Sequence, residues 1–443
     1  MKTAFTLLAV LALAACSGES GLPDPTGKGS VRAINAIPGS QQIAFRIEER
    51  LLEAISYKSG SSGVRYDDFE YTFNFDASFL GDTNARRVAS LVQKIDNERD
   101  YTFVITGDVA APDITVWEGD ERVFSGTETV FEVRYAHLAE SLGPVDIYLA
   151  AEGVAPAAGN AIATLDYLEV LPAMDIEADA YVLTITASGD PADIIYQSNN
   201  VTYVAQRAYI VPIFAGDETD TAPYTVRLIP SSGTPTSLPD TRFAPTARFM
   251  QMSASLAAAD IYDDELLTSL VLENQAFGDI SDDIPIEATT TTFSFTPTGN
   301  TGAVLFEDDI VAATGTRYNF IVAGDDSDRD ALVYAPDRRS VTSYAKLSFV
   351  HVSKNHEILD IYIVDAGQGI EDASATFILP YSGTSNALPL AAGAYDIYLT
   401  ANAEQTILAG PVEVNLALGD VVESLLIDTV DPADAEIRIV PQP

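Results

Sequence analysis

VRYAH at residues 133–137, followed about ten residues later by DIY at residues 146–148, is the stretch that decides the fold, because the pair recurs along the chain. Related opening strands stand at residues 31–35 (VRAIN), 247–251 (ARFMQ) and 347–351 (LSFVH), each closing on a polar residue. DIY returns at residues 260–262 and 360–362, whereas the first unit has QIA at residues 42–44. The chain therefore consists of four repeated units, each of ordinary domain length.

The later strands of each unit show the alternation of a sheet with one buried face. Tyr71, Phe73 and Phe75 share one side of their strand, and polar residues occupy the other. Short strands separated by turn residues predict an all-β chain of tandem immunoglobulin-like antiparallel β-sandwiches, about seven strands each. The DIY tyrosines, Tyr148, Tyr262 and Tyr362, are expected to face a core rather than to form an exposed stripe.

The repeat spacing predicts the domain boundaries. We expect a signal peptide over residues 1–15 and a flexible tether over 16–30, which is rich in Gly, Ser and Pro. Four sandwiches follow at residues 31–128, 129–240, 245–341 and 344–441. Short connections between them favour a semi-rigid rod.

Several features of the repeat resemble one known family. They are the V-R-x-x-(N/H) opening strand, the DIY strand, an aromatic residue before a turn, and a tyrosine-led strand that runs into Gly-Asp. The aromatic positions are Tyr57, Tyr167, Phe277 and Tyr381. Together they resemble the domain of unknown function 4397, in four divergent copies over residues 31–440, clearest in the second and fourth. The resemblance implies a β-sandwich in a cell-surface context and supplies no catalytic residues.

The start of the chain carries an export signal. Lys2 precedes an apolar segment over residues 4–13, which is shorter than the roughly 20 residues of a membrane span. LAAC at residues 13–16 resembles the lipobox of bacterial lipoproteins, which implies that Cys16 receives diacylglycerol and a further acyl chain such as palmitate. Ser17 after the cysteine resembles the sorting pattern of outer-membrane lipoproteins. We therefore expect a bacterial cell-envelope protein bound to the membrane through lipid on Cys16, the alternative being an ordinary secretory signal with an incidental cysteine.

Charge excludes one class of partner. The chain has 24 basic and 65 acidic residues, a net charge of −41, and such a surface repels nucleic acid. Two explanations of the acidity remain open: solubility in a saline exterior, and a surface that binds divalent cations.

No catalytic signature is evident in the sequence. A G-x-S-x-G nucleophile motif is absent, and the single cysteine is expected to be lipidated. Of the three histidines, His137 and His351 occupy the position held by Asn35 and Gln251 in the other units, which indicates a hydrogen-bonding structural role. His356 is expected in a loop. We therefore predict that the chain is not an enzyme.

Calcium is the one cofactor considered. Asp326, Asp328 and Asp330, with Asp337 further on, offer carboxylate oxygens in a loop-like spacing, although Ala331 stands where a calcium loop needs glycine. An acidic solvated turn is the main interpretation, and weak Ca²⁺ binding is the alternative. Acidic turns at residues 216–220 and 428–434 suggest that an acidic composition is a general feature of this turn in the repeat.

These observations favour a lipid-anchored, non-enzymatic cell-envelope protein for adhesion, recognition or envelope structure, with an extracellular or periplasmic ligand. The first alternative is an array of modules that bind glycan or Ca²⁺. The second is a hydrolase that uses a pair of carboxylates.

Overall fold

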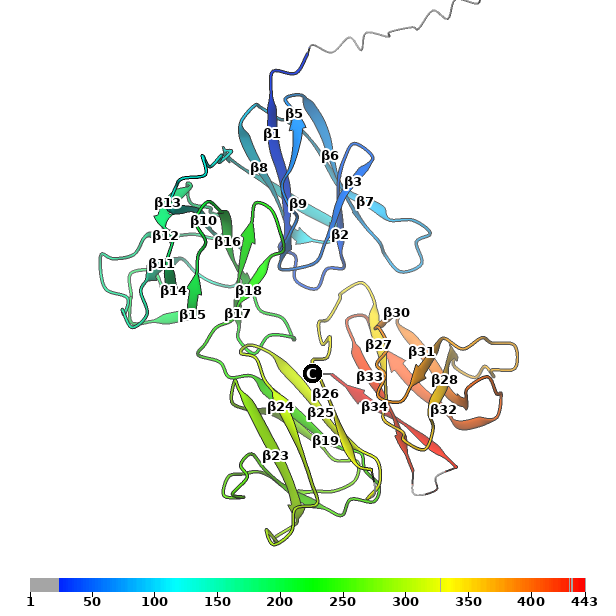
Figure 1. The fold of residues 1–443 in the computed structure, drawn as a ribbon. Helices are drawn as coiled ribbons and strands as arrows, with labels where there is room; N and C mark the ends of the chain where they lie inside the picture. Colours follow the sequence, from blue (N-terminus) through cyan, green and yellow to red (C-terminus); the bar gives the residue numbers. More distant parts are fainter. Residues whose placement is uncertain (1–23, 327, 430, 432, 443) are drawn as a thin grey trace, which may run out of the picture.

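The computed structural model describes residues 24–326, 328–429, 431 and 433–442, which contain strands and no helix. Eight sheets of four or five strands form four β-sandwiches, so the predicted fold class is confirmed (Figure 1). No helix in this part of the chain is long and apolar enough to cross a membrane.

The first two sandwiches have nine strands each. Sandwich 1 consists of β1 (Lys28–Asn35), β2 (Ile43–Ile47), β3 (Arg50–Ile55), β4 (Ser59–Gly60), β5 (Val64–Asp67), β6 (Glu70–Ala77), β7 (Arg86–Lys94), β8 (Arg99–Asp108) and β9 (Ala111–Asp120). Sandwich 2 consists of β10 (Val130–His137), β11 (Val145–Ala150), β12 (Ala163–Leu165), β13 (Met174–Glu177), β14 (Ala180–Ala187), β15 (Ile194–Thr202), β16 (Ala208–Ala215), β17 (Tyr224–Pro230) and β18 (Thr236–Leu238). β1 begins three residues inside the segment predicted as tether, because its first residues pair with β5.

The last two sandwiches have eight strands each. Sandwich 3 consists of β19 (Thr246–Gln251), β20 (Ala259–Tyr262), β21 (Leu270–Gln275), β22 (Ile280–Pro285), β23 (Thr290–Pro297), β24 (Phe306–Val311), β25 (Arg317–Ala323) and β26 (Asp330–Tyr334). Sandwich 4 consists of β27 (Ala345–His351), β28 (Ile358–Asp365), β29 (Phe377–Pro380), β30 (Leu388–Leu390), β31 (Gly393–Ala401), β32 (Ile407–Leu416), β33 (Val421–Asp428) and β34 (Ala435–Pro441).

Each sandwich departs from purely antiparallel pairing at one place. The opening strand pairs in parallel with the long strand near the end of the same unit: β1 with β8, β10 with β16, β19 with β25, and β27 with β33. We call the sheet built on this parallel pair the seam sheet and the other the outer sheet. All remaining pairs are antiparallel.

Each core lies between a seam sheet and an outer sheet. In sandwich 1, Phe45, Phe73, Phe75 and Phe103 are fully buried and pack ring against ring, with Phe73 and Phe103 4.4 Å apart between centroids. Burying a side chain of this size stabilises the fold by about 1.5–3 kcal/mol. The alternation in the sequence placed Phe73 and Phe75 correctly.

The DIY strand has a different role for each of its three residues. The central isoleucine points into the core, as Ile147 does in sandwich 2, so its neighbours point to the reverse face. There Asp146 and Asp260 accept backbone N–H groups of Gly189 and Gly299, each at 2.8 Å. The three tyrosines are buried, as expected, which excludes an exposed stripe. The apolar cluster around Tyr362 contains Ile370 and Tyr398 and is separate from the core between the two sheets.

A tyrosine near the start of the long parallel strand fixes the preceding loop. The Tyr101 hydroxyl accepts the N–H of Asp96 at 3.1 Å, and the Tyr318 hydroxyl accepts that of Ala313 at 3.0 Å. This is the tyrosine corner of immunoglobulin-like sandwiches.

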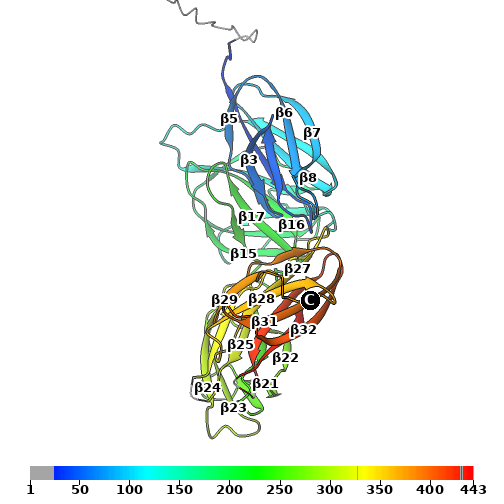
Figure 2. The ribbon, with the colours of Figure 1, turned by 90° about the vertical axis from the view of Figure 1, so that its right-hand side faces the viewer.

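The sandwiches pack side by side in two pairs, so the predicted rod of four units in line is wrong (Figures 1 and 2). The seam sheets of sandwiches 1 and 2 enclose an apolar cluster that includes Trp117, Phe214 and Ile229, which we call the first seam. Those of sandwiches 3 and 4 enclose Met250, Ile321, Leu425 and others, which we call the second seam. Equivalent strands meet in each seam, as in an isologous dimer interface.

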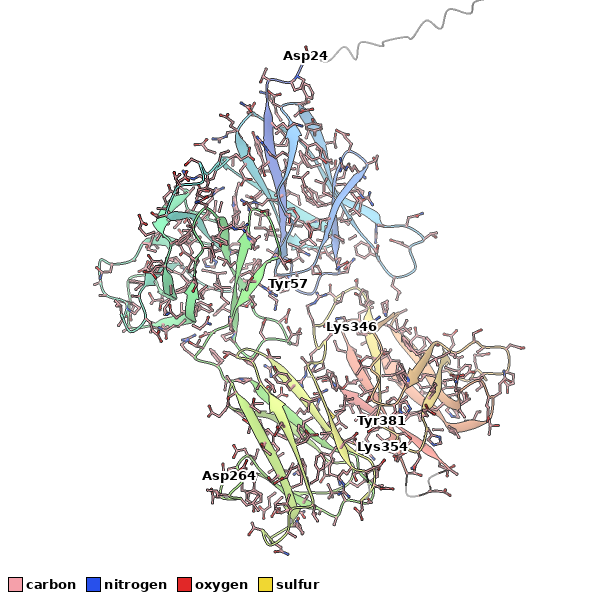
Figure 3. All side chains as sticks on the ribbon, in the orientation of Figure 1. Asp24, Tyr57, Asp264, Lys346, Lys354 and Tyr381 are labelled. Carbon is pink, nitrogen blue, oxygen red and sulfur yellow. The ribbon has the colours of Figure 1, made fainter. Side chains whose placement is uncertain are left out.

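The aromatic residues before the turns contribute to the seams. The Tyr57 hydroxyl of sandwich 1 donates to the carbonyl of Ala215 in sandwich 2 at 2.7 Å, and that of Tyr381 in sandwich 4 donates to Asp330 in sandwich 3 at 2.6 Å (Figure 3). Phe277 lies against the guanidinium of Arg438. In sandwich 2 the neighbour of Tyr167, Leu168, packs in the seam instead.

The two pairs meet at one junction. Thr342, in the connection between sandwiches 3 and 4, donates its N–H to the carbonyl of Gly39 in sandwich 1 at 2.9 Å, and Arg339 donates to the carbonyl of Ser40 at 2.6 Å. The acidic turn after β16 lies at the same place, where Arg317 of sandwich 3 donates to the carbonyl of Asp220 at 2.9 Å.

Candidate functional site

The predicted lipid-attachment residue, Cys16, lies outside the described residues, as do the signal peptide and the first part of the tether. The membrane anchor therefore stays a prediction from the sequence.

Each of the four aspartates that the sequence offers as calcium ligands forms an ion pair with a basic side chain. Asp326 pairs with Arg329, and Lys354 reaches Asp328 at 3.5 Å and Asp330 at 3.2 Å. Asp337 pairs with Lys346 at 2.7 Å. The described residues contain no group of three or more His, Cys, Asp or Glu side chains that could hold a metal ion. Calcium binding at these aspartates would have to displace lysine and arginine.

The acidic turn at residues 216–220 is part of the junction. Lys58 is buried and its ammonium contacts Asp217 at 2.8 Å and Asp220 at 2.5 Å. Burial raises the pKa of Asp217, but Lys58 and hydrogen bonds from Thr219 outweigh burial, so the pKa is lowered overall. Composition suggested a solvated hairpin, whereas this turn joins two sandwiches.

The polar residues that end the four opening strands each make an equivalent hydrogen bond. Asn35, His137, Gln251 and His351 each accept the backbone N–H of the residue two positions later, at 2.7–3.3 Å. All four are buried, and burial lowers the pKa of His137 and lowers that of His351 to about 4. The predicted structural role is confirmed, and it explains why Asn, Gln and His replace one another here.

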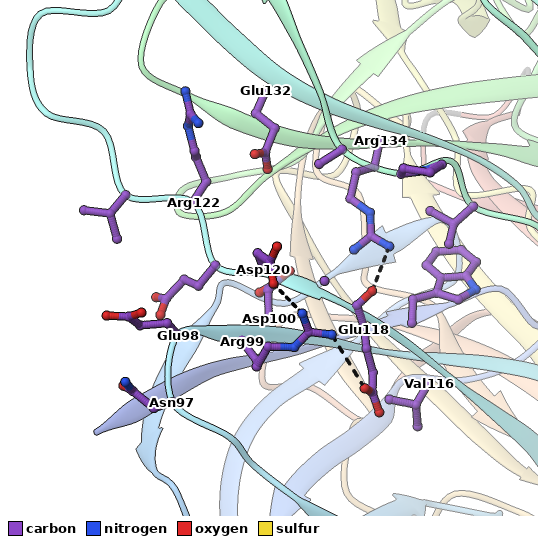
Figure 4. A pocket seen from close by; sticks show the side chains of 17 residues that line it. Asn97, Glu98, Arg99, Asp100, Val116, Glu118, Asp120, Arg122, Glu132 and Arg134 are labelled. Carbon is purple, nitrogen blue, oxygen red and sulfur yellow. Dashed lines mark hydrogen bonds and ion pairs between the residues drawn. The ribbon is translucent and has the colours of Figure 1, made fainter. Parts of the chain in front are cut away.

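A cleft of about 1150 Å³ opens at one end of the first seam, and it is the candidate functional site (Figure 4). Its walls come from β8 and β9, from the connection after β9, and from β10 with the segment before β13. Three arginines and six carboxylates line it, and Trp117, the only tryptophan of the chain, contributes to its floor. The cleft lies beside the start of β1, where Lys28 exchanges hydrogen bonds with Asn97 and Glu98.

Most charges in and around the cleft are paired. Arg99 contacts Asp120 and Glu118, and Arg122 contacts Asp175 at 2.8 Å. Glu121 is held by Arg65 at 3.0 Å. These pairs are partly exposed, so each contributes little to stability, about 0–1 kcal/mol.

Arg134 is different because no carboxylate forms an ion pair with it, although Asp100 and Glu132 lie near enough to stabilise its charge. Among the described residues three arginines are buried: Arg32 pairs with Asp100 at 2.8 Å, Arg338 pairs with Asp283 at 2.7 Å, and Arg134 has no acidic partner within 4.0 Å. Its Nε and Nη2 donate only to the carbonyls of Leu171 and Glu118, at 3.3 and 3.4 Å.

The remaining nitrogen of Arg134, Nη1, makes no hydrogen bond within the described part of the chain and lies against Gly119. A Cβ atom at residue 119 would stand 3.1 Å from Nη1, so glycine leaves this side of the guanidinium open. Burial lowers the pKa of Arg134, yet a guanidinium stays charged in proteins. A buried charge without an ion-pair partner is costly, which makes this position a candidate anion site.

Glu132 lies two residues before Arg134 on the same strand and also lines the cleft. No lysine, arginine or histidine nitrogen of the described chain comes within 4.0 Å of its carboxylate, and burial raises its pKa. The cleft therefore holds one cation without an ion pair, Arg134, and two carboxylates without one, the partly buried Glu132 and the exposed Glu98.

The sequence singled out the arginine of VRYAH as part of the repeat without assigning it a role. Its position in the repeat was visible, but whether a carboxylate faces it depends on how two sandwiches pack. The local pattern does not say which residues of the two sandwiches meet.

A family comparison identifies the repeat. The model for the domain of unknown function DUF4397 matches residues 29–148 and 245–362. The chain belongs to this family. Each DUF4397 match covers one complete sandwich and continues into the next as far as its DIY tyrosine, Tyr148 or Tyr362. The expectation that sandwiches 2 and 4 show the family most clearly is wrong, because the matches cover sandwiches 1 and 3 in full. No curated protein matches the chain.

Both DUF4397 matches include the opening strand of the neighbouring sandwich, β10 or β27, which contributes to the seam. The matched segment thus contains elements from both sides of a seam. The match at residues 29–148 also includes Glu132 and Arg134.

Proposed function

We propose that this chain is a non-enzymatic recognition protein of the bacterial cell envelope, anchored through lipid on Cys16, and that the cleft of the first seam binds its ligand. The observation that carries the proposal is the buried Arg134 guanidinium, which lines the cleft without a carboxylate partner. Arg32 and Arg338, the other two buried arginines of the described chain, are neutralised by Asp100 and Asp283. A binding site, by contrast, keeps an unpaired charge for its ligand.

The anchor rests on the sequence. LAAC at residues 13–16 resembles a lipobox, and Ser17 favours the outer membrane. The cleft lies at the end of sandwich 1 where the chain enters β1, so a lipid on Cys16 would hold the cleft toward the membrane side of the molecule.

The non-enzymatic part of the proposal is supported by the histidines. His137 and His351 are buried, with their Nδ1 atoms occupied by backbone N–H groups, and neither lines the cleft. A general base must reach the proton that it removes, which these two cannot do.

Cell fractionation tests the anchor. The unmodified chain is expected in the membrane fraction, and Cys16→Ser is expected in the soluble fraction with an unchanged circular dichroism spectrum. If the folded Cys16→Ser chain still sediments with membranes, the lipid anchor is wrong.

A whole-cell assay tests recognition and catalysis together. The purified Cys16→Ser chain is expected to be retained on bacterial cells, to lose that retention on Arg134→Met, and to show no turnover on a panel of glycoside and ester substrates. Retention that survives Arg134→Met would exclude the cleft as the recognition site. Turnover that is lost on Glu132→Gln would overturn the non-enzymatic assignment.

A further inference from the structure

We propose that the cleft binds a small zwitterion, a molecule that carries a carboxylate and an ammonium group a few bonds apart. Arg134 takes the carboxylate and Glu132 takes the ammonium group. The inference rests on the proposed recognition function and names its ligand class. Free amino acids and short peptides share this chemistry.

The anionic half of the ligand is required by Arg134. Its side chain is 7% exposed, and its two hydrogen bonds go to backbone carbonyls at the long end of the usual range. A carboxylate at Nη1 would supply a charge-assisted hydrogen bond where glycine at residue 119 leaves room.

The cationic half of the ligand is required by Glu132 and by the negative net charge of the cleft lining. Six carboxylates against three arginines give the lining a net charge of −3, which disfavours a simple anion. An ammonium group beside Glu132 removes that repulsion. Residues two apart on a strand project from the same face about 6–7 Å from each other, so one small molecule can reach both groups.

Two single-charge ligands fit less well. A carboxylate without an ammonium group leaves Glu132 unpaired, and a cation without a carboxylate leaves Arg134 uncompensated.

Trp117 makes the test direct, because it lines the cleft and is the only tryptophan. The Cys16→Ser chain is titrated with glycine and with diglycine, and with acetate and methylammonium as single-charge probes. Tryptophan fluorescence is read together with isothermal titration calorimetry. Glycine, diglycine or both are expected to bind at least tenfold more tightly than either single-charge probe. Whichever binds more tightly distinguishes a free amino acid from a peptide.

Variants assign the two charges. Arg134→Met is expected to weaken zwitterion binding at least tenfold, and Glu132→Gln to remove the preference for zwitterions over acetate. The matched control is Arg248→Met, at the equivalent strand position in sandwich 3, which is expected to bind like the parent. Thermal melts establish that each variant is folded.

Three results would overturn the inference. They are no heat and no fluorescence change with either zwitterion at millimolar concentrations, equal affinity of the Arg134→Met variant, and acetate binding as tightly as glycine. If zwitterions fail while retention on cells still depends on Arg134, the ligand class is wrong and the recognition function stands. If retention also fails to depend on Arg134, the proposed function falls with it.

Discussion

The two seams have the same architecture and differ in how their charges are neutralised. Both are formed by equivalent strands of adjacent sandwiches around an apolar cluster. In the second seam the connection after β26 inserts Arg338, which pairs with both carboxylate oxygens of Asp283 at 2.7 and 2.9 Å and donates to Asn319 at 3.0 Å. In the first seam the connection after β9 borders an open cleft, and Arg134 has no carboxylate within 4.0 Å.

The polar network of the second seam extends to Glu423. Its carboxylate accepts from Asn319 at 2.9 Å and from Gln442 at 3.3 Å, and burial raises its pKa. Arg338, Asp283 and Glu423 therefore each have a side-chain partner inside the protein, whereas Arg248, the counterpart of Arg134, donates only to the carbonyls of Ser281 and Pro441. The comparison indicates that the second seam is a structural interface, whereas the first combines an interface with a binding site.

Removing Arg338 should produce the largest effect on stability. Arg338→Met leaves Asp283 paired with Arg317 alone and takes positive charge away from the buried Glu423, which we expect to destabilise the second pair by about 3 kcal/mol, the lower end of the range for a broken buried pair. Denaturant unfolding of the Cys16→Ser chain, followed by far-ultraviolet circular dichroism, measures the loss. Trp117 fluorescence reports the first seam and should move much less. Equal shifts of both signals would show that the pairs do not unfold independently.

Acid should weaken the second pair through His351. This histidine is neutral when folded, with a pKa of about 4, and has a pKa near 6.5 when unfolded. The unfolded chain therefore binds more protons in this window, and the free energy of unfolding falls as the pH drops from 6.5 to about 4, by about 3 kcal/mol. His351→Asn should remove that part of the pH dependence, because Asn35 makes the same hydrogen bond. A variant that keeps the full dependence would contradict this assignment.

Calcium should have the smallest effect. Asp326, Asp328, Asp330 and Asp337 already pair with basic side chains, so the melting temperature of the Cys16→Ser chain should be the same in millimolar Ca²⁺ and in EDTA. If Ca²⁺ raises the melting temperature and Asp330→Asn abolishes this increase, the cation-binding alternative is restored. Such a result would also show that calcium displaces Lys354 from Asp328 and Asp330.

Much of the fold could be predicted because its signals are local. Alternation in β6 placed Phe73 and Phe75 in the core, and the exchange of His137 with Asn and Gln indicated a structural hydrogen bond. The side-by-side packing was missed, although Phe103, Val104 and Ile105 in β8 are apolar on both faces. Such a run indicates a strand buried on both sides, yet it does not say which sandwich covers it.

The candidate site was harder to predict for the same reason. Whether Arg134 forms an ion pair depends on how residues of two sandwiches meet. Abundant acidic residues made any pairing look plausible in the sequence. Only the packing distinguishes the neutralised Arg32 from the uncompensated Arg134.

The stability of the Arg134→Met variant without ligand tests the central claim most directly. Denaturant unfolding of this variant and its Cys16→Ser parent is followed by Trp117 fluorescence. If Arg134 is kept for a ligand, removing its uncompensated charge should leave the free energy of unfolding within about 1 kcal/mol of the parent, or raise it. A loss of about 3 kcal/mol or more, comparable to that expected for Arg338→Met, would show that Arg134 is a structural residue and would contradict the account.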